Sequence, residues 1–336
     1  MQQRQLGPFQ VSAIGLGCMN LSHAYGAPTS PEQSIKVLHA ALDAGVTLFD
    51  TAAMYGFGAN ETLVGTVLKG ERQRFTLASK CGMQGVDVAG DGKLVRVIDG
   101  RPETLRATCE AALRRLQTDV IDLYYLHRWD KKVPIEESVG GLSDLVRAGK
   151  IQSIGLSEVS ATTLRKAHAV HPIAAVQTEY SLWTRNPEIA VLQACSELGI
   201  AFVAFSPVAR GFLSDVALDP TTFDVKDIRQ SQPRFAVAEN YAANLKLLAP
   251  FKQIARDADC TSAQLALAWL LHKAPHVIPI PGTTSVEHLL EDTAADGVKL
   301  HADILVRLEE LINHKTVTGS RYGAQGTGEV DTEMFS

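Results

Sequence analysis

Residues 101–126, RPETLRATCEAALRRLQTDVIDLYYL, join the pattern of one helix to the pattern of one strand. Pro102 stands in the first turn of the predicted helix, and apolar residues then recur at spacings of three and four, which is typical of a helix with one buried face. The apolar and aromatic run 121–126 predicts a buried strand. Because the connection between the two patterns is so short, this stretch indicates one unit of a β/α repeat.

The alternation of a helix pattern and a strand pattern recurs along the chain. Two further helices are predicted by their first residues: one opens at Ser30-Pro31-Glu32-Gln33 and ends at Gly45, and another opens at Thr261-Ser262-Ala263-Gln264. Short apolar runs predict strands at 13–17, 47–50, 75–80, 121–126, 151–156, 174–178, 200–205 and 277–280. Eight strands alternating with helices predict an α/β fold, a (β/α)8 TIM barrel formed by one domain over residues 1–336.

Three segments lie outside the repeat. Residues 1–12 predict a hairpin around Gly7-Pro8 that caps the bottom of the barrel. Residues 211–239 are rich in Asp, Pro, Ser and Gln without a clean period, and residues 315–336 form a tail rich in Gly and Thr. Long loops in compact domains are usually functional or disordered, so we expect both segments to shape a pocket at the carboxyl ends of the strands.

The bulk composition favours a small-molecule partner. The formal net charge is -5 and no run of five Lys or Arg occurs, which argues against binding to nucleic acid or to an anionic membrane. The first five residues are polar and no apolar stretch approaches the length of a membrane span, so we expect a cytoplasmic location. The five cysteines include no C-x-x-C pair and predict reduced thiols. The oligomeric state is left open.

A Rossmann sheet is the competing α/β architecture. Residues 15–20, GLGCMN, superficially resemble a dinucleotide-binding fingerprint. Asn20 replaces its third glycine, and the next helix begins about ten residues later at Ser30-Pro31 rather than at once. The sequence therefore favours the barrel.

Ionisable residues follow three consecutive predicted strands. Asp50 ends the second strand, Lys80 ends the third, His127 follows the fourth, and Tyr55 lies on the loop after Asp50. Because the carboxyl ends of parallel strands meet at one face of a barrel, we expect these four side chains to converge. Each residue alone has an ordinary alternative as a turn former, a packing residue or a satisfied polar group, and spacing alone leaves catalytic and structural roles both open.

The quartet suits the reduction of a carbonyl group. Hydride arriving at the carbonyl carbon leaves charge on the oxygen, which needs a proton, and Tyr55 is the candidate acid. A free phenol has a pKa of about 10. A Lys80 ammonium within about 4 Å would favour the phenolate by roughly 4 kcal/mol, so we expect Lys80 to lower the pKa of Tyr55. We expect Asp50 to pair with Lys80, and His127 to orient the carbonyl oxygen or share the proton.

Three segments resemble the aldo-keto reductase superfamily: GVTLFDTAAMYG at 45–56, LASK at 77–80 and LYYLHR at 123–128. The resemblance implies an NADPH-dependent enzyme that reduces an aldehyde or ketone by direct hydride transfer, without a metal. It implies that the catalytic tetrad is Asp50, Tyr55, Lys80 and His127, with Tyr55 as general acid. Glu158, where many members have Asn, and the run EYSLWTR at 179–185 resemble the branch of pyridoxal reductase-like and auxin-induced-protein-like enzymes.

The resemblance also implies the cofactor contacts. Ser157 and Gln177 would bind the nicotinamide carboxamide, Phe205 would stack on the ring, and Ser206 and Arg210 would meet phosphate. The complete implied set is Ser157, Gln177, Phe205, Ser206, Pro207, Arg210, Gly282, Thr283, Thr284, Ser285, His288, Glu291 and Asp292. Many members have an Arg in place of His288 and a Lys in place of Gly282, so the expected preference for NADP over NAD is weaker than nicotinamide binding itself.

Apolar residues near the same barrel end predict a substrate wall, and each could equally be loop packing. These residues are Tyr25, Met54, Phe57, Trp129 and Trp183. His168 and His171 lie three apart on a predicted helix, but no carboxylate-rich motif accompanies them, which favours solvated residues over a metal site. Two other functions keep the barrel: a cofactor-sensing regulatory subunit, as in the potassium-channel β-subunits that resemble this superfamily, and a metal-dependent hydrolase or isomerase.

Overall fold

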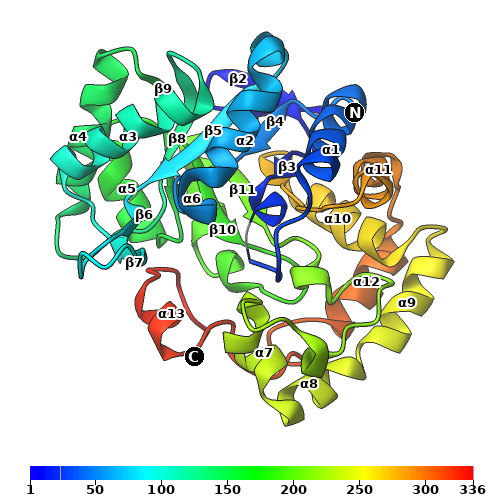
Figure 1. The fold of residues 1–336 in the computed structure, drawn as a ribbon. Coiled ribbons are helices and arrows are strands. Elements are labelled where there is room, and N and C mark those ends of the chain that lie inside the picture. The colour runs from blue at the N-terminus through cyan, green and yellow to red at the C-terminus, as the bar shows by residue number, and fades with distance from the viewer. Residues whose placement is uncertain (23, 336) are drawn as a thin grey trace.

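Eight parallel strands form the centre of the protein in a computed structural model that describes residues 1–22 and 24–335 (Figure 1). Their order in the sheet is β12-β11-β10-β9-β8-β5-β4-β3. The strands are β3 Leu16–Gly17, β4 Leu48–Asp50, β5 Thr76–Cys81, β8 Ile121–Leu126, β9 Ile151–Ser157, β10 Ile173–Glu179, β11 Ala201–Phe205 and β12 Val277–Pro279. Each predicted strand overlaps an observed one, so the predicted α/β class and the eight parallel strands are confirmed.

Two backbone hydrogen bonds join the first and last strands. The amide of Gly15 donates to the carbonyl oxygen of Pro279 at 3.0 Å, and the amide of Gly17 donates to that of Pro281 at 2.9 Å. A Cβ atom on Gly17 would lie 2.9 Å from the carbonyl oxygen of Ile280, so only glycine permits this close approach. These bonds connect the two edges of the sheet and curl it into a barrel.

Helices cover the outside of the strands. They are α1 Pro31–Asp43, α2 Ala59–Leu68, α3 Pro102–Leu116, α4 Ile135–Arg147, α5 Ala161–Val170, α6 Val191–Leu198, α9 Leu248–Asp257, α10 Ser262–Lys273, α11 Val286–Ala294 and α12 Ala302–Leu311. The predicted helix starts are confirmed, since Ser30 caps α1 and Thr261 forms a capping box with Gln264 at α10. Within the described part of the chain, no helix is long and apolar enough to cross a membrane.

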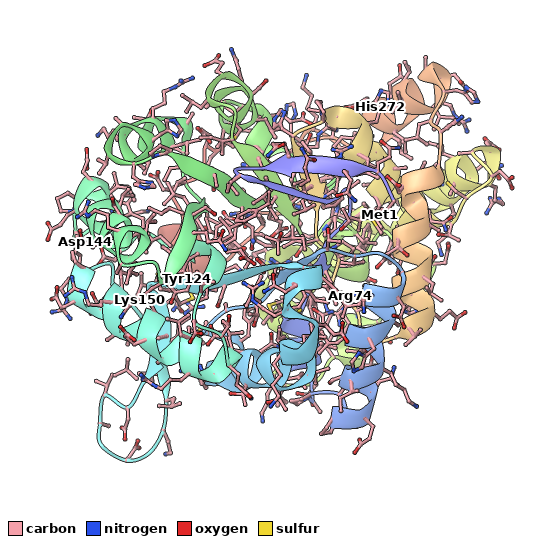
Figure 2. All side chains as sticks on the ribbon, turned by 90° about the horizontal axis from the view of Figure 1, so that it is seen from above. Met1, Arg74, Tyr124, Asp144, Lys150 and His272 are labelled. Atoms are coloured by element: carbon pink, nitrogen blue, oxygen red, sulfur yellow. The ribbon has the colours of Figure 1, made fainter. Side chains whose placement is uncertain are left out.

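An antiparallel hairpin, β1 Gln3–Leu6 and β2 Phe9–Ser12, closes the amino ends of the strands, and this confirms the predicted hairpin. Leu6 and Val11 pack into the apolar cluster inside the barrel. The guanidinium of Arg4 donates to the carbonyl oxygens of Leu271 at 2.6 Å and Ala274 at 2.7 Å, at the carboxyl end of α10. Figure 2 shows side chains filling the molecule, and Tyr124 of β8 is fully buried in a second apolar cluster, which also contains residues of the surrounding helices.

The segment 211–239, predicted as a long loop, is partly helical. It contains short helical turns at Pro220–Thr222 and Ile228–Ser231, then α7 Pro233–Ala236 and the beginning of α8 Ala238–Leu245. These turns are too short to produce a visible period in the sequence. The tail contains α13 Ala324–Gly328, and Ser336 lies outside the described residues. Figure 1 shows β2 at one end of the molecule and α7, α8 and α13 at the opposite end.

A second antiparallel hairpin, β6 Met83–Val86 and β7 Val95–Ile98, follows β5. The hairpin is not predicted by the sequence pattern, because its strands lie in a run that shares neither the apolar density nor the spacing of the barrel strands. In Figure 1 the hairpin lies beside α13, and Arg96 of β7 forms an ion pair with Glu329 of the tail. The hairpin and the tail therefore meet at the carboxyl end of the barrel.

Candidate active site

The structure brings Asp50, Tyr55, Lys80 and His127 together at the carboxyl ends of three neighbouring strands. Asp50 is the last residue of β4, and Lys80 lies next to the end of β5, where it is in register with Tyr125 of β8. His127 follows β8 directly, and Tyr55 lies in the short turn after β4. The parallel register places successive strand ends side by side, which explains how residues far apart in the sequence converge.

Lys80 is the centre of this group and is completely buried. Its Nζ donates to the Oδ1 of Asp50, to the carbonyl oxygen of Thr51 at 2.9 Å and to the hydroxyl oxygen of Tyr55 at 3.2 Å. The other oxygen of Asp50 accepts a hydrogen bond from the amide of Gln177 at 2.7 Å. All three ammonium donors are used and both carboxylate oxygens are paired, which is the condition under which two charges can persist in a buried site.

Burial raises the pKa of Tyr55, and the opposing effect of the Lys80 ammonium does not overcome it because the Asp50 carboxylate raises this pKa further. The ammonium of Lys80 lowers the pKa of Tyr55, as expected, but the net shift is upward because the desolvation of the phenol and the Asp50 carboxylate oppose it. Tyr55 remains a protonated phenol at neutral pH.

The pKa of Lys80 itself is raised. Burial disfavours the ammonium, but its interactions with Asp50 and Tyr55 outweigh this cost. Lys80 is therefore a permanent cation that holds the oxygen of Tyr55.

His127 lies with its ring edge-on to Tyr55, with ring centroids 5.8 Å apart and an interplanar angle of 85°. Burial, followed by the charges of Arg128, Lys80 and Arg96, lowers the pKa of His127 well below its ordinary value. Among the described residues, its buried Nδ1 has no hydrogen-bond partner. The imidazole is therefore neutral at pH 7 and can donate one hydrogen bond.

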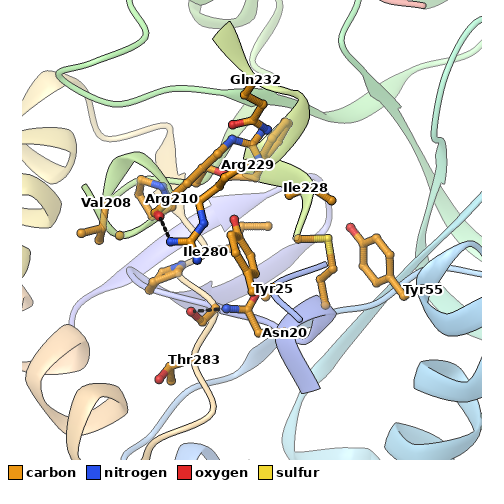
Figure 3. A pocket seen from close by; sticks show the side chains of 18 of the residues that line it. Asn20, Tyr25, Tyr55, Val208, Arg210, Ile228, Arg229, Gln232, Ile280 and Thr283 are labelled. Atoms are coloured by element: carbon orange, nitrogen blue, oxygen red, sulfur yellow. Dashed lines mark hydrogen bonds between the residues drawn. The ribbon is translucent and has the colours of Figure 1, made fainter. Parts of the chain in front are cut away.

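A cavity of about 1160 Å³ opens above Tyr55 and extends to the first turns of α11. Figure 3 shows Tyr55 on one side of it and Thr283 on the other. Most of the implied cofactor residues line this cavity: Ser157, Gln177, Phe205, Ser206, Pro207, Arg210, Gly282, Thr283, Thr284, His288, Glu291 and Asp292. Ser285 is not among the lining residues, and its hydroxyl instead accepts a hydrogen bond from the amide of His288 and caps α11.

Residues 13–313 match the Aldo/keto reductase family. The chain belongs to this family. It is thus an NAD(P)-dependent oxidoreductase with the NADP-binding barrel of the family, and the family resemblance stated from its sequence motifs is confirmed.

Relatives of this aldo/keto reductase cover nearly its full length. The chain is 43% identical over 333 residues to probable aldo-keto reductase 1 of Glycine max, and the alignment covers 96% of this chain and 93% of that protein. A glycerol dehydrogenase from Gluconobacter oxydans superposes with a TM-score of 0.83 at 27% identity, over 92% of this chain and 94% of the other. An aldo/keto reductase from Klebsiella pneumoniae, solved in complex with NADP and acetate, has a TM-score of 0.70 at 26% identity, over 96% and 99% of the two chains.

The basic groups in the cavity differ from the expectation. Arg210 lines the cavity, but its Nη2 pairs at 2.6 Å with buried Glu179 instead of standing free for a phosphate. Arg229, which the sequence analysis missed, lies over the ring of Tyr25 at 5.0 Å and donates to the carbonyl oxygen of Arg210 at 3.3 Å. Arg229 belongs to the segment without a period, so no pattern in the sequence distinguished it.

Asn20 is a second residue that the sequence analysis missed. In the sequence, Asn20 stands out only as the residue that replaces the third glycine of a Rossmann fingerprint. Its side-chain amide donates to the carbonyl oxygen of Gly282 at 3.1 Å, and it lines the cavity (Figure 3). It thereby connects the loop after β3 to the loop after β12.

Two of the five predicted substrate residues, Tyr25 and Met54, line the cavity, whereas Phe57, Trp129 and Trp183 are not among its lining residues. Trp183 is buried and stacks on Phe212 with ring centroids 4.2 Å apart. The ring of Phe57 packs against Gly85 of the β6–β7 hairpin. The indole of Trp129 donates to the carbonyl oxygen of Val133 at 2.7 Å and packs on the core. Trp183 and Trp129 thus pack within the structure, which is an alternative that the sequence left open, whereas Phe57 remains exposed.

The end of the cavity beside α11 holds a buried carboxyl group, that of Asp292. Burial, aided by the nearby Glu291, raises the pKa of Asp292 to about 8. The side chain is therefore mostly protonated at neutral pH. This end of the cavity carries less negative charge than its two acidic residues indicate, which suits the binding of a phosphate.

Proposed function

We propose that this aldo/keto reductase reduces an aldehyde or ketone to the corresponding alcohol with NADPH, and that Asp50, Tyr55, Lys80 and His127 carry the reaction. The observation on which the proposal depends is the phenol of Tyr55. Its oxygen lies 3.2 Å from the buried ammonium of Lys80, and it keeps its proton because its pKa is raised. An acid of this kind beside a cavity is what a developing alkoxide requires.

The residues of the cavity fit a nicotinamide cofactor. Ser157 and Gln177 are in register at the ends of β9 and β10 and present a hydroxyl and an amide that can bind a carboxamide. Phe205, at the end of β11, offers a ring for stacking. When bound, NADPH supplies the hydride. Thr283 and Thr284 precede the amino end of α11, where backbone donors favour a phosphate, and this supports a preference for NADP over NAD.

The residues of the chain then have distinct tasks. Tyr55 transfers its proton to the substrate oxygen, and Lys80 stabilises the phenolate that this transfer leaves behind. Neutral His127 donates a hydrogen bond that orients the carbonyl oxygen. Asp50 keeps Lys80 charged and in place, and Gln177 holds the second oxygen of Asp50.

The proposed substrate class is based on the sequence similarity of the chain to its relatives. Its 43% identity to a plant aldo-keto reductase supports its place in the pyridoxal reductase-like and auxin-induced-protein-like branch. We therefore propose pyridoxal-like and other small aromatic or aliphatic carbonyl compounds as substrates. Tyr25 and Met54 provide apolar surface for such molecules.

The decisive experiment replaces the acid. Tyr55→Phe removes only the hydroxyl group, and we expect kcat to fall at least about 100-fold while NADPH still binds. Turnover is followed by NADPH absorbance and binding by fluorescence titration. Tyr124→Phe is the matched control, because the hydroxyl of Tyr124 is buried without a hydrogen-bond partner among the described residues.

Unchanged turnover of Tyr55→Phe would refute the assignment of the acid. Tighter binding of NADH than of NADPH in the same titration would refute the preference for NADP. Wild-type protein that binds NADPH but turns over no member of a broad carbonyl panel would instead support a cofactor-sensing regulatory subunit.

A further inference from the structure

Two guanidinium groups line the catalytic end of the cavity, and the proposed reaction uses neither of them. Arg128 directly follows His127, and Arg96 lies on β7 of the second hairpin. Both line the same cavity as Tyr55 and His127. Both also contribute, after burial, to the lowered pKa of His127, which agrees with their being close to its ring.

Arg128 has unused hydrogen-bonding capacity. Its Nη1 donates to the carbonyl oxygen of His127 at 2.7 Å and to the hydroxyl of Ser157 at 3.2 Å. Among residues 1–22 and 24–335, these are the hydrogen bonds that this guanidinium makes, and it forms no ion pair with a carboxylate. A guanidinium has five N–H donors, so Nε and Nη2 of Arg128 remain available at the cavity.

Arg96 is arranged differently. Its Nη2 forms an ion pair with Glu329, which lies just after α13 in the tail and also lines the cavity. The same carboxylate accepts a hydrogen bond from Gln325 at 3.2 Å. The charge of Arg96 is thus largely balanced by the tail, while the charge of Arg128 is not.

The net charge of the side chains at the catalytic end of the cavity favours the binding of an anion. Lys80 and Asp50 form a neutral pair below the cavity floor, and Arg96 and Glu329 form a second pair at its rim. Arg128 therefore adds a net positive charge beside Tyr55. A planar guanidinium recognises a carboxylate through two parallel hydrogen bonds, which fix orientation as well as supply affinity.

We propose that the substrates of this enzyme carry an anionic group, such as a carboxylate, and that Arg128 binds this group and so determines specificity. The inference rests on the proposed function, since it concerns the same cavity and the same carbonyl reduction. Glu329 then weakens the binding of an anionic substrate, because its carboxylate pairs with Arg96 and repels the incoming anion. The tail thereby limits how strongly the rim attracts negative substrates.

The test compares two aldehydes of similar shape, para-carboxybenzaldehyde and the uncharged para-nitrobenzaldehyde. For Arg128→Met we expect kcat/KM to fall about tenfold or more further with the carboxylate than with the nitro compound, the scale of one lost charge-assisted hydrogen bond. Arg128→Lys should recover part of the difference. Glu329→Gln should shift the preference toward the carboxylate. Arg106→Met, an exposed change on α3, is the charge-matched control.

The outcomes separate the two proposals. Wild-type protein that reduces neither aldehyde with NADPH overturns the proposed function. Wild-type activity combined with equal losses for both aldehydes in Arg128→Met, together with weaker NADPH binding, overturns the anion site and assigns Arg128 to the cofactor through Ser157. If Arg128→Met does not fold, Glu329→Gln decides, and an unchanged ratio between the two aldehydes refutes the inference.

Discussion

Tyr55 and Lys80 illustrate how one site keeps an acid protonated beside a permanent cation. The ammonium stabilises the phenolate, but the buried phenol would have to lose its proton in a poorly solvated position next to Asp50 as well. Desolvation prevails, and the pKa of Tyr55 is raised above its ordinary value of 10.0. Lys80 thus stabilises charge that appears only during the reaction, which is where stabilisation accelerates it.

These directions predict the pH dependence of reduction. Tyr55 must be protonated and His127 neutral, so activity is lost as pH rises through the raised pKa of Tyr55 and as pH falls through the lowered pKa of His127. We expect kcat/KM to stay level from below pH 6.5 to at least pH 10.0, the ordinary values of the two groups. A pH profile with an uncharged aldehyde, measured at saturating NADPH so that the titration of Asp292 in the proposed cofactor site does not enter, tests this range. A fall in kcat/KM within the range would contradict the raised pKa of Tyr55 or the lowered pKa of His127.

The C-terminal tail is the element that completes the cavity. Arg321 and Glu158 form a buried ion pair, and the residues from Tyr322 to Gly326, together with Glu329, line the cavity. Further along, the carboxylate of Asp331 accepts hydrogen bonds from the amide and hydroxyl of Ser160 at the start of α5. Glu158, where many members of the family have Asn, thus holds the tail in place through its ion pair with Arg321.

Removing one partner of the Arg321–Glu158 pair should release the tail. Arg321→Met leaves the Glu158 carboxylate buried without its partner, and breaking a buried pair in this way costs about 3–5 kcal/mol. We expect a lower melting temperature and faster limited proteolysis of the tail. The double variant with Glu158→Gln should recover part of the loss, because no unpaired charge remains.

Arg307→Met is the control for the tail variants, since it removes a partner of Asp257 at the surface. Equal melting temperatures for Arg321→Met and Arg307→Met would show that the tail does not depend on the buried pair.

At the scale of the whole molecule, stability and chemistry occupy opposite ends of the barrel. The β1–β2 hairpin closes the amino ends of the strands, while the catalytic residues, the tail and the second hairpin surround the carboxyl ends. Arg4 attaches the first hairpin to the barrel through carbonyl oxygens at the end of α10, where a cation also complements the helix dipole.

This separation predicts that Arg4→Met affects stability and not catalysis. The variant leaves partly buried carbonyl groups without this donor, and the cost for each is at most roughly 1–3 kcal/mol, the range for a fully buried group. Thermal unfolding should begin several degrees lower, whereas kcat/KM at 25 °C should match the wild-type value. A parallel fall in kcat/KM of the folded variant would show that the two ends are coupled.

The eight strands, the starts of α1, α3 and α10 and the candidate catalytic quartet could be predicted from the sequence, because apolar period, helix capping and strand ends are local properties of the chain. The pKa of Tyr55, the burial of Trp183 and the partners of two arginines became known from the folded structure alone. Arg210 pairs with a residue 31 positions away and Arg321 with one 163 positions away. Desolvation and ion pairing depend on neighbours in space, and no local pattern specifies those neighbours.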